Sequence, residues 1–244
     1  MASASREHLD QGQQMNMFLN DFRAVIFDMD GLLLDTEKIA MSAFLESCKV
    51  YGYDPEIAIY LKCIGTNAPR TREILLEGYG EKFPFEEISK IWSQKYKKAL
   101  FEDTIPLKPG VREILRTVKK SGLKMAVATS TKYSTAMEKL KKTELHSFFS
   151  VVVGGDQVKK SKPDPEIYLK VANLISEPAK HCLVFEDSDN GVLSAHRAGM
   201  QVIQIPDLKA PSSEISKLGH LTVSSFHAVQ ALIENKESLS GIKF

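Results

Sequence analysis

Residues 24–31 read AVIFDMDG, an apolar run that ends at two carboxylates spaced one residue apart. The run contains β-branched residues and no polar ones, which is typical of a short strand buried on both faces of a parallel sheet. Asp28 and Asp30 therefore stand at the carboxyl end of a predicted strand, where open α/β sheets bind their ligands. A single Asp here would more simply cap a turn, and Gly31 permits a tight one. Later apolar runs, however, also end in polar clusters.

The composition is that of an ordinary globular protein. The chain has 244 residues, of which 43% are hydrophobic and 26% charged, enough for one large domain or one domain with a smaller insert. The net charge is +1 and no basic or acidic block is present, so we expect neither nucleic acid nor a membrane as a partner. No apolar run approaches the roughly 20 residues of a membrane span.

The cysteines indicate a reducing compartment. Cys48, Cys63 and Cys182 are far apart and form no CxxC pair, which argues against a disulfide framework or a structural zinc site. The N-terminus lacks the apolar core of a signal peptide. We therefore expect a cytoplasmic protein, and a monomer.

Hydrophobic periodicity divides the chain into three parts. Residues 1–20 are polar and without sustained periodicity, so we expect a flexible leader. Residues 38–104 carry apolar residues at helical spacing only. From residue 105, helical segments alternate with short apolar runs at 124–128, 149–153, 182–185, 202–205 and 221–223. The predicted fold class is α/β: a doubly wound, Rossmann-like parallel sheet at 21–37 and 105–244, with an inserted α-helical cap domain at 38–104.

Hydroxyl and lysine side chains lie at or near the ends of two of these runs. Thr129 and Ser130 follow the run 124–128, and hydroxyl and N–H groups at a strand end can hold phosphate oxygens, although both residues are also common caps. Lys162 is followed by Pro163, and Pro165 opens the next predicted helix. A lysine in such a stiff segment can act as a fixed positive charge beside a phosphate.

Glu186 and Asp187 end the run 182–185. If this strand lies beside the first, the two acids face Asp28 and Asp30. Two unit charges about 4 Å apart repel by roughly 4 kcal/mol at an effective dielectric near 20, so the four carboxylates need a cation. Oxygen ligands beside a phosphate favour Mg²⁺. The predicted metal ligands are Asp28, Asp30 through its main-chain carbonyl, and Asp187, with Glu186 completing or supporting the shell.

These groups together suit phosphoryl transfer, which needs charge stabilisation around the transferred phosphate. Asp28 would attack phosphorus and form an aspartyl-phosphate. Asp30 would protonate the leaving oxygen and later take a proton from the attacking water. Thr129 and Lys162 would complete the catalytic set.

The four clusters resemble, in order, the motifs of the haloacid dehalogenase superfamily of phosphatases: Asp28-Met29-Asp30-Gly31, Thr129, Lys162 with Pro163, and Glu186-Asp187. The segment 38–104 is similar to the cap of the subclass that includes β-phosphoglucomutase and many sugar-phosphate phosphatases. Residues 27–37, 183–187 and 198–202 are most similar to pseudouridine 5′-phosphatases and glycerol-3-phosphate phosphatases. The resemblance implies a Mg²⁺-dependent phosphomonoesterase that hydrolyses a small phosphorylated metabolite of sugar or nucleoside type.

The cap would choose the substrate, because it closes over the leaving group. Asn67 and Arg70 are the cap residues predicted to bind substrate, together with Ser130 of the core. The alternative for Arg70 is a surface ion pair with Glu73 or Glu77. A phosphomutase is a second possibility, but the cap histidine of the mutase is replaced here by Ala40, which favours hydrolysis.

Two other classes fit the sequence less well. Cysteine-dependent phosphatases need five residues between Cys and Arg, whereas six separate Cys63 from Arg70. A phospho-accepting signalling module would also use strand-end Asp, Thr and Lys residues, but it needs only about half this length and no cap. A signalling module would hold its phosphate for minutes, whereas an enzyme would turn over repeatedly.

Overall fold

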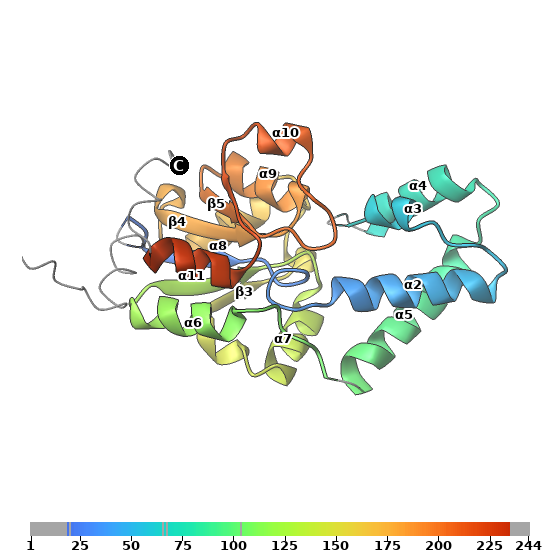
Figure 1. Ribbon diagram of the computed structural model, residues 1–244, viewed down its shortest axis with the longest axis horizontal. Coiled ribbons are helices and arrows are strands. Elements are labelled where there is room, and N and C mark those ends of the chain that lie inside the picture. The colour runs from blue at the N-terminus through green and yellow to red at the C-terminus, as the bar shows by residue number, and fades with distance from the viewer. Residues whose placement is uncertain (1–18, 20, 65, 67, 103, 235–244) are drawn as a thin grey trace, which may run out of the picture.

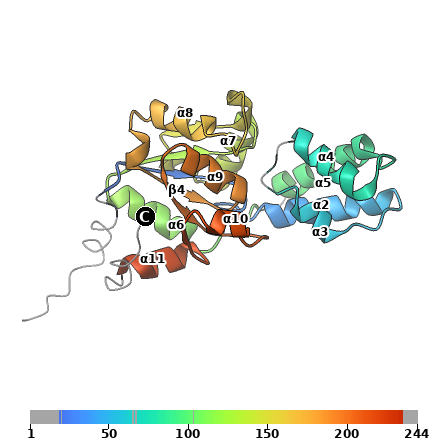
Figure 2. The same ribbon diagram turned by 90° about the horizontal axis from the view of Figure 1, so that it is seen from above.

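The computed structural model describes residues 19, 21–64, 66, 68–102 and 104–234. The described chain forms two lobes that lie side by side, a sheet covered by helices and a group of helices alone (Figure 1, Figure 2). The two segments that join the lobes run next to each other. The N–H of Asp35 donates to the carbonyl of Pro106 at 2.9 Å, and that of Lys108 to the carbonyl of Leu33 at 3.1 Å. The chain therefore leaves and re-enters the sheet lobe at one place.

The sheet is parallel and has the order β3-β2-β1-β4-β5-β6. Its strands are β1 (Ala24–Phe27), β2 (Lys124–Ala128), β3 (Val151–Val153), β4 (Cys182–Glu186), β5 (Gln201–Gln204) and β6 (Leu221–Thr222). The predicted fold class of the core is confirmed. β1 lies between β2 and β4, with Phe27 opposite Val127 and Phe185. This register brings the polar residues that follow β1, β2 and β4 to the same edge of the sheet.

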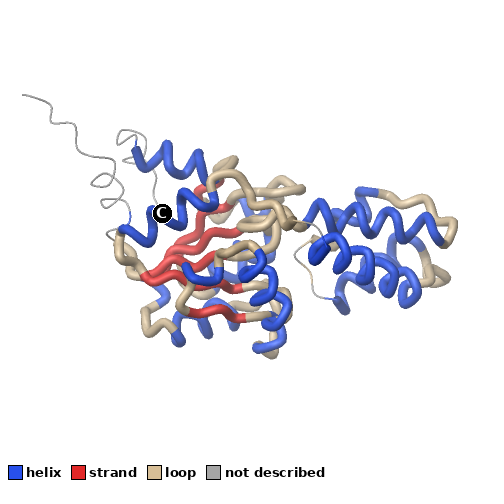
Figure 3. Tube along the Cα trace, turned by 90° about the horizontal axis from the view of Figure 1, so that it is seen from below, coloured by secondary structure: helices blue, strands red, loops and turns tan. Residues whose placement is uncertain are grey.

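Helices cover both faces of the sheet, and the strands lie between them in Figure 3. They are α6 (Val111–Lys120), α7 (Tyr133–Lys142), α8 (Glu166–Leu174), α9 (Asp189–Arg197), α10 (Ser213–Ser216) and α11 (Phe226–Glu234). Single 3₁₀ turns lie at His146–Phe148, Gly155–Gln157 and Ala179–His181. Val25 and Phe27 pack with α6, α7 and α11, whereas Ala24 and Ile26 pack with α8, α9 and α10. The alternation follows from the two-residue period of a strand.

The second lobe consists of α2 (Glu37–Val50), α3 (Ile57–Leu61), α4 (Ala68–Tyr79) and α5 (Phe85–Glu102). It has its own apolar core, which includes Phe44, Tyr60, Leu75 and Ile88. The end of α5 packs against the other lobe, because Leu100 is buried in the cluster on one face of the sheet. We call α2–α5 the helical lobe and the rest of the described chain the α/β lobe.

Two sequence-based expectations remain predictions. The division into domains at 37/38 and 104/105 is one of them; the other is the leader 1–20, of which only Leu19 lies within the described residues. In the part of the chain that the structure describes, no helix combines the length and apolar character needed to cross a membrane.

Candidate active site

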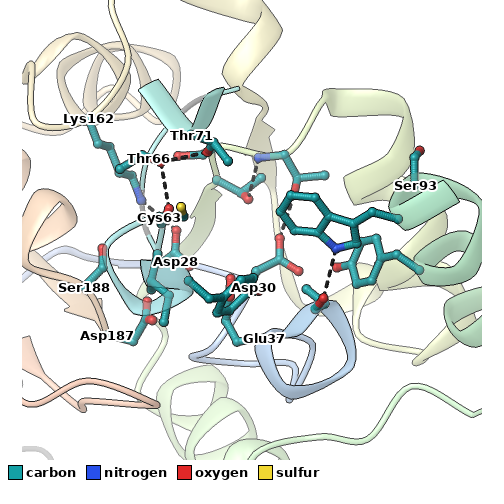
Figure 4. A pocket seen from close by; sticks show the side chains of 18 of the residues that line it. Asp28, Asp30, Glu37, Cys63, Thr66, Thr71, Ser93, Lys162, Asp187 and Ser188 are labelled. Atoms are coloured by element: carbon teal, nitrogen blue, oxygen red, sulfur yellow. Dashed lines mark hydrogen bonds and ion pairs between the residues drawn. The ribbon is translucent and has the colours of Figure 1, made fainter. Parts of the chain in front are cut away.

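A cavity of about 370 Å³ lies where the carboxyl edge of the sheet meets the helical lobe (Figure 4). Six of the predicted site residues line it together: Asp28, Asp30, Thr129, Ser130, Lys162 and Asp187. The helical lobe contributes Glu37, Ala40, Tyr60, Cys63, Ile64, Thr66, Thr71, Ser89, Trp92, Ser93 and Tyr96. Residues separated by more than a hundred positions in the sequence thus share one pocket.

Lys162 joins the carboxylates that end β1 and β4. Its Nζ lies 2.6 Å from Oδ1 of Asp28 and 2.6 Å from Oε1 of Glu186, and it also donates to the carbonyl of Ala128 at 3.1 Å. Burial by itself would lower the pKa of Lys162, but the two carboxylates raise the pKa well above its ordinary value. The lysine is therefore a fixed cation. Burial raises the pKa of Asp28 to about 7 against the opposing charge of Lys162.

Glu186 is fully buried behind Lys162, and both of its oxygens accept hydrogen bonds. Oε1 accepts from Lys162 at 2.6 Å and from the hydroxyl of Tyr168 at 2.9 Å. Oε2 accepts from the backbone N–H groups of Asp187 and Ser188 at 2.9 and 3.0 Å, and from the Ser188 hydroxyl at 3.1 Å. These bonds leave Glu186 little capacity to bind a metal directly. We expect it to support the site by holding Lys162 and the 187–188 backbone.

Asp187 faces the turn after β1. A Cβ at Gly31 would lie only 2.5 Å from Oδ2 of Asp187, and Gly31 has a φ of +85°, so glycine is required here for two reasons. Among the described residues, no hydrogen bond or ion pair reaches the Asp187 carboxylate. Burial and the neighbouring charges of Glu186 and Asp28 raise the pKa of Asp187 well above its ordinary value. A buried carboxylate without a cation partner is what a divalent metal would compensate.

The donor set can be tested against Mg²⁺. Among the described residues, no three His, Cys, Asp or Glu side chains converge as a ready-made metal site. Mg²⁺ does not require one, because it is usually bound through one or two carboxylates, phosphate oxygens and several waters. The carboxylates of Asp28 and Asp187 with the main-chain carbonyl of Asp30 fit that pattern.

Asp30 is oriented by three donors, none of which was predicted from the sequence. Oδ1 accepts from the hydroxyl of Thr36 and from Nζ of Lys139, each at 2.6 Å, and Oδ2 accepts from the hydroxyl of Thr131 at 2.7 Å. Burial by itself would raise the pKa of Asp30, but the charge of Lys139 and these hydrogen bonds lower the pKa below its ordinary value. A signal for Lys139 was present, because residues 136, 139 and 140 share the buried face of α7.

The hydroxyls that follow β2 differ in exposure. Thr129 is buried and its Oγ1 accepts from the N–H of Thr131 at 3.1 Å, whereas Ser130 is exposed. Both line the cavity beside Lys162. They can therefore offer hydroxyl groups to an anion bound beside Asp28 and Lys162.

Arg70, one of the helical-lobe residues predicted to bind substrate, is not among the described residues that line this cavity. Arg70 lies on α4 and pairs with Glu73 at 2.8 Å and Glu77 at 3.2 Å, the alternative considered from the sequence. It lines an adjoining cavity that also reaches Lys162. Asn67 lies outside the described residues.

Cys63 has the surroundings of a structural thiol. Its Sγ donates to the carbonyl of Ile59 at 3.7 Å, and burial raises the pKa of Cys63 to about 12. A nucleophilic cysteine needs a lowered pKa. These surroundings do not favour a cysteine-dependent mechanism.

Comparison with known proteins agrees with this geometry. Residues 25–205 match the family model described as haloacid dehalogenase-like hydrolase. The chain belongs to this family. A phosphorylated carbohydrates phosphatase of Thermotoga maritima is 39% identical over 180 residues, which cover 74% of this chain and 83% of that protein. The family resemblance stated from the sequence is thus confirmed, and the chain is a phosphatase of the haloacid dehalogenase type.

Two further comparisons extend the likeness. A Drosophila melanogaster protein named probable pseudouridine-5'-phosphatase is 33% identical over 215 residues, covering 85% of this chain and 90% of that protein. The crystal structure of CbbY from Rhodobacter sphaeroides in complex with phosphate matches with a TM-score of 0.70 and 25% identity. That match covers 84% of this chain and 95% of CbbY, so it extends over both lobes.

Proposed function

We propose that the protein is a Mg²⁺-dependent phosphomonoesterase that hydrolyses a small sugar- or nucleoside-type phosphate through an aspartyl-phosphate at Asp28. One observation carries this proposal: Asp28 stands at the end of the central strand, 2.6 Å from a buried lysine and beside Asp187, in a cavity walled by the helical lobe. The fixed charge of Lys162 is suited to a phosphoryl group whose negative charge must be stabilised during transfer.

In the first half of the reaction, a carboxylate oxygen of Asp28 attacks phosphorus and the bond from phosphorus to the leaving oxygen breaks. Lys162, Thr129 and Ser130 bind the phosphoryl oxygens. The contacts of Asp30 in the free protein favour its carboxylate form, so it first takes up a proton as the substrate binds and then gives this proton to the leaving oxygen, which departs as an alcohol. In the second half, Asp30 takes a proton from water, the water oxygen attacks phosphorus, and Asp28 is released with inorganic phosphate.

The residues that would hold Mg²⁺ are Asp28 and Asp187 through their carboxylates and Asp30 through its main-chain carbonyl. When bound, the metal would neutralise phosphoryl oxygens and keep Asp28 from being repelled by the substrate. Glu186 supports the site indirectly, because its Oε1 accepts a hydrogen bond from Lys162 and holds that side chain in place.

The helical lobe is proposed to act as the cap of the active site, with the domain boundaries given above. Its side of the cavity carries hydroxyl and aromatic groups, including Thr71, Ser89, Tyr60 and Trp92. Hydroxyls can bind the hydroxyls of a sugar, and aromatic rings can contact a sugar or a base. The names of two relatives, which refer to phosphorylated carbohydrates and to pseudouridine, support the same substrate classes.

Hydrolysis is favoured over phosphate return to a sugar. Position 40 is alanine, and its carbonyl accepts a hydrogen bond from Trp92 Nε1 at 2.9 Å. The sequence has no histidine between Glu37 and Thr104 to take the part that the cap histidine has in the mutase. The cavity therefore presents no imidazole from the described helical lobe.

Replacement of the nucleophile tests the proposal. Asp28→Asn should reduce phosphate release from pseudouridine 5′-phosphate, glycerol 3-phosphate and hexose phosphates to background, because an amide cannot form the acyl-phosphate. Intact-mass measurement after rapid acid quenching should detect a phosphorylated wild-type chain and no such species in the variant. Asp54→Asn, at an exposed position of the helical lobe, is the matched control and should retain full activity. Normal turnover by Asp28→Asn would disprove the assignment.

A further inference from the structure

Lys139 is a buried lysine that the proposed reaction steps do not use. Its side chain is 1% exposed, although it belongs to a helix of the α/β lobe whose other lysines include exposed ones. Lysine is almost never fully buried unless its charge is paired. Its Nζ contacts Oδ1 of Asp30 at 2.6 Å and the hydroxyl of Tyr96 at 3.0 Å.

The Asp30 carboxylate receives its donors from separate parts of the fold. Thr36 immediately precedes α2, Thr131 follows β2, and Lys139 lies on α7. The two hydroxyls can rotate, but the ammonium is fixed by burial and by its second partner. A carboxylate that must reach the leaving oxygen and then a water needs a defined orientation, because proton transfer requires hydrogen-bond distance.

Tyr96 connects this contact to the other lobe. It lies on α5 of the helical lobe and lines the cavity, and its ring centroid is 5.3 Å from Nζ of Lys139. One ammonium therefore touches both the predicted acid–base group and the helix that walls the substrate cavity. A shift of α5 would change the contacts of Lys139 and with them the support of Asp30.

We propose that Lys139 is a positioning residue that orients the Asp30 carboxylate for proton transfer and, through Tyr96, makes this orientation depend on the position of the helical lobe. The inference rests on the proposed phosphatase reaction. A positioning role differs from that of a simple bond between the lobes. Lys142 provides such a bond for comparison. Lys142, on the same helix, donates to the carbonyl of Leu100 of α5 at 2.7 Å, and no hydrogen bond or ion pair joins it to Asp30.

The test compares two leaving groups. Lys139→Met keeps the length of the side chain and removes its charge, and kcat/KM reports only the steps up to phosphoryl transfer to Asp28. For glycerol 3-phosphate, whose alkoxide needs a proton, we expect kcat/KM to fall by about 10- to 100-fold. For 4-nitrophenyl phosphate, whose leaving group needs no proton, we expect a fall of less than about 3-fold. Slowed water activation should also produce a pre-steady-state burst of nitrophenolate in this variant.

Three companion variants separate positioning from structural support. Lys142→Met should leave the ratio of the two kcat/KM values unchanged. Tyr96→Phe, which removes only the hydroxyl, should lower the ratio in the same direction and by less. The double variant Tyr96→Phe/Lys139→Met should be no worse than Lys139→Met, since both act through one contact.

The outcomes that would overturn the inference are specific. Equal loss on both substrates in a folded Lys139→Met, or no loss on either, would contradict the positioning role. If Lys139→Met does not fold, Tyr96→Phe decides, and a wild-type ratio in that variant overturns the proposal. If glycerol 3-phosphate is not turned over, the best alkyl phosphate of the panel used for Asp28→Asn takes its place in the comparison. Failure of the wild-type protein to release phosphate from 4-nitrophenyl phosphate and from every member of that panel would instead disprove the proposed function, and this inference with it.

Discussion

At the scale of single residues, the site depends on charges that are buried and paired. Lys162 contacts Asp28 and Glu186 with 3% of its side chain exposed, an arrangement that costs desolvation and that well-packed apolar residues would often match in stability. The proposed phosphoryl transfer gives a reason for a buried lysine at this place, beside the end of β1. Tyr168 is part of the same network, since its hydroxyl donates a hydrogen bond to Oε1 of Glu186, the oxygen that also accepts from Lys162.

Gly191 allows a test of this network without altering a charged residue. It lies in the first turn of α9, and a Cβ there would overlap the carboxylate of Glu186. We expect Gly191→Ala to displace Glu186 from Lys162, to lower the free energy of unfolding by about 1–3 kcal/mol, and to reduce kcat. Denaturant unfolding and phosphate release measure the two effects. His196→Ala, at an exposed position of the same helix, should change neither, and wild-type behaviour of Gly191→Ala would refute the account.

At the scale of elements, α5 contributes side chains to the apolar cores of both lobes. Ile88 near its start packs in the core of the helical lobe, whereas Leu100 near its end is buried in a cluster of the sheet. Trp92 and Tyr96 lie between them and line the cavity. The helix therefore connects the wall of the cavity to the core of the sheet that carries Asp28.

The anchoring of α5 leads to a prediction about stability. Leu100→Ala should lower the free energy of unfolding by about 2–5 kcal/mol, because it removes a fully buried side chain from a packed core. Leu169→Ala, at a position of α8 that is 45% exposed, should change it by less than about 0.5 kcal/mol. Chemical denaturation followed by circular dichroism gives both values. Equal effects of the two substitutions would show that the end of α5 is not anchored as described.

At the scale of the whole molecule, two lobes with separate apolar cores enclose one polar cavity. The α/β lobe supplies the charged groups of the cavity apart from Glu37, and the helical lobe supplies most of its hydroxyl and aromatic groups. This division suits an enzyme in which one lobe performs the chemistry and the other chooses the leaving group. The hydrogen bonds between the joining segments at 33–35 and 106–108 hold the two connections next to each other.

A metal that binds only the folded form of a protein raises the melting temperature of that protein. Mg²⁺ at 100 times its dissociation constant would stabilise the native state by about 2.7 kcal/mol. We expect this increase in Tm for the wild-type protein, reversal by EDTA, and no increase with potassium chloride of equal ionic strength. In Asp187→Asn the Mg²⁺ effect should be lost, while the metal-free Tm should be at least that of the wild type, since burial already disfavours the ionised carboxylate that the amide replaces. A Mg²⁺ shift retained by Asp187→Asn would exclude Asp187 as a ligand.

The sequence by itself determined the parallel α/β core, because strands and helices leave local hydrophobic periods that can be read along the chain. It also determined that Asp28, Thr129, Lys162 and Asp187 follow or lie near strand ends, and strand ends of a parallel sheet share an edge. The adjacency of β1 and β4 could be stated only as a condition, and the structure meets it.

Only the tertiary structure decided which partners each charged group has. It saturates Glu186 with hydrogen bonds and brings Lys139 to Asp30 across more than a hundred residues of sequence. For Arg70 it selects the surface pair with Glu73 and Glu77, which the sequence offered as one of two alternatives. Lysine is normally a surface residue, and no local sequence pattern predicts that folding will place a distant carboxylate beside it. The reason is physical: periodicity reflects which face of an element is buried, whereas the pairing of buried charges depends on contacts between elements that are distant in the chain.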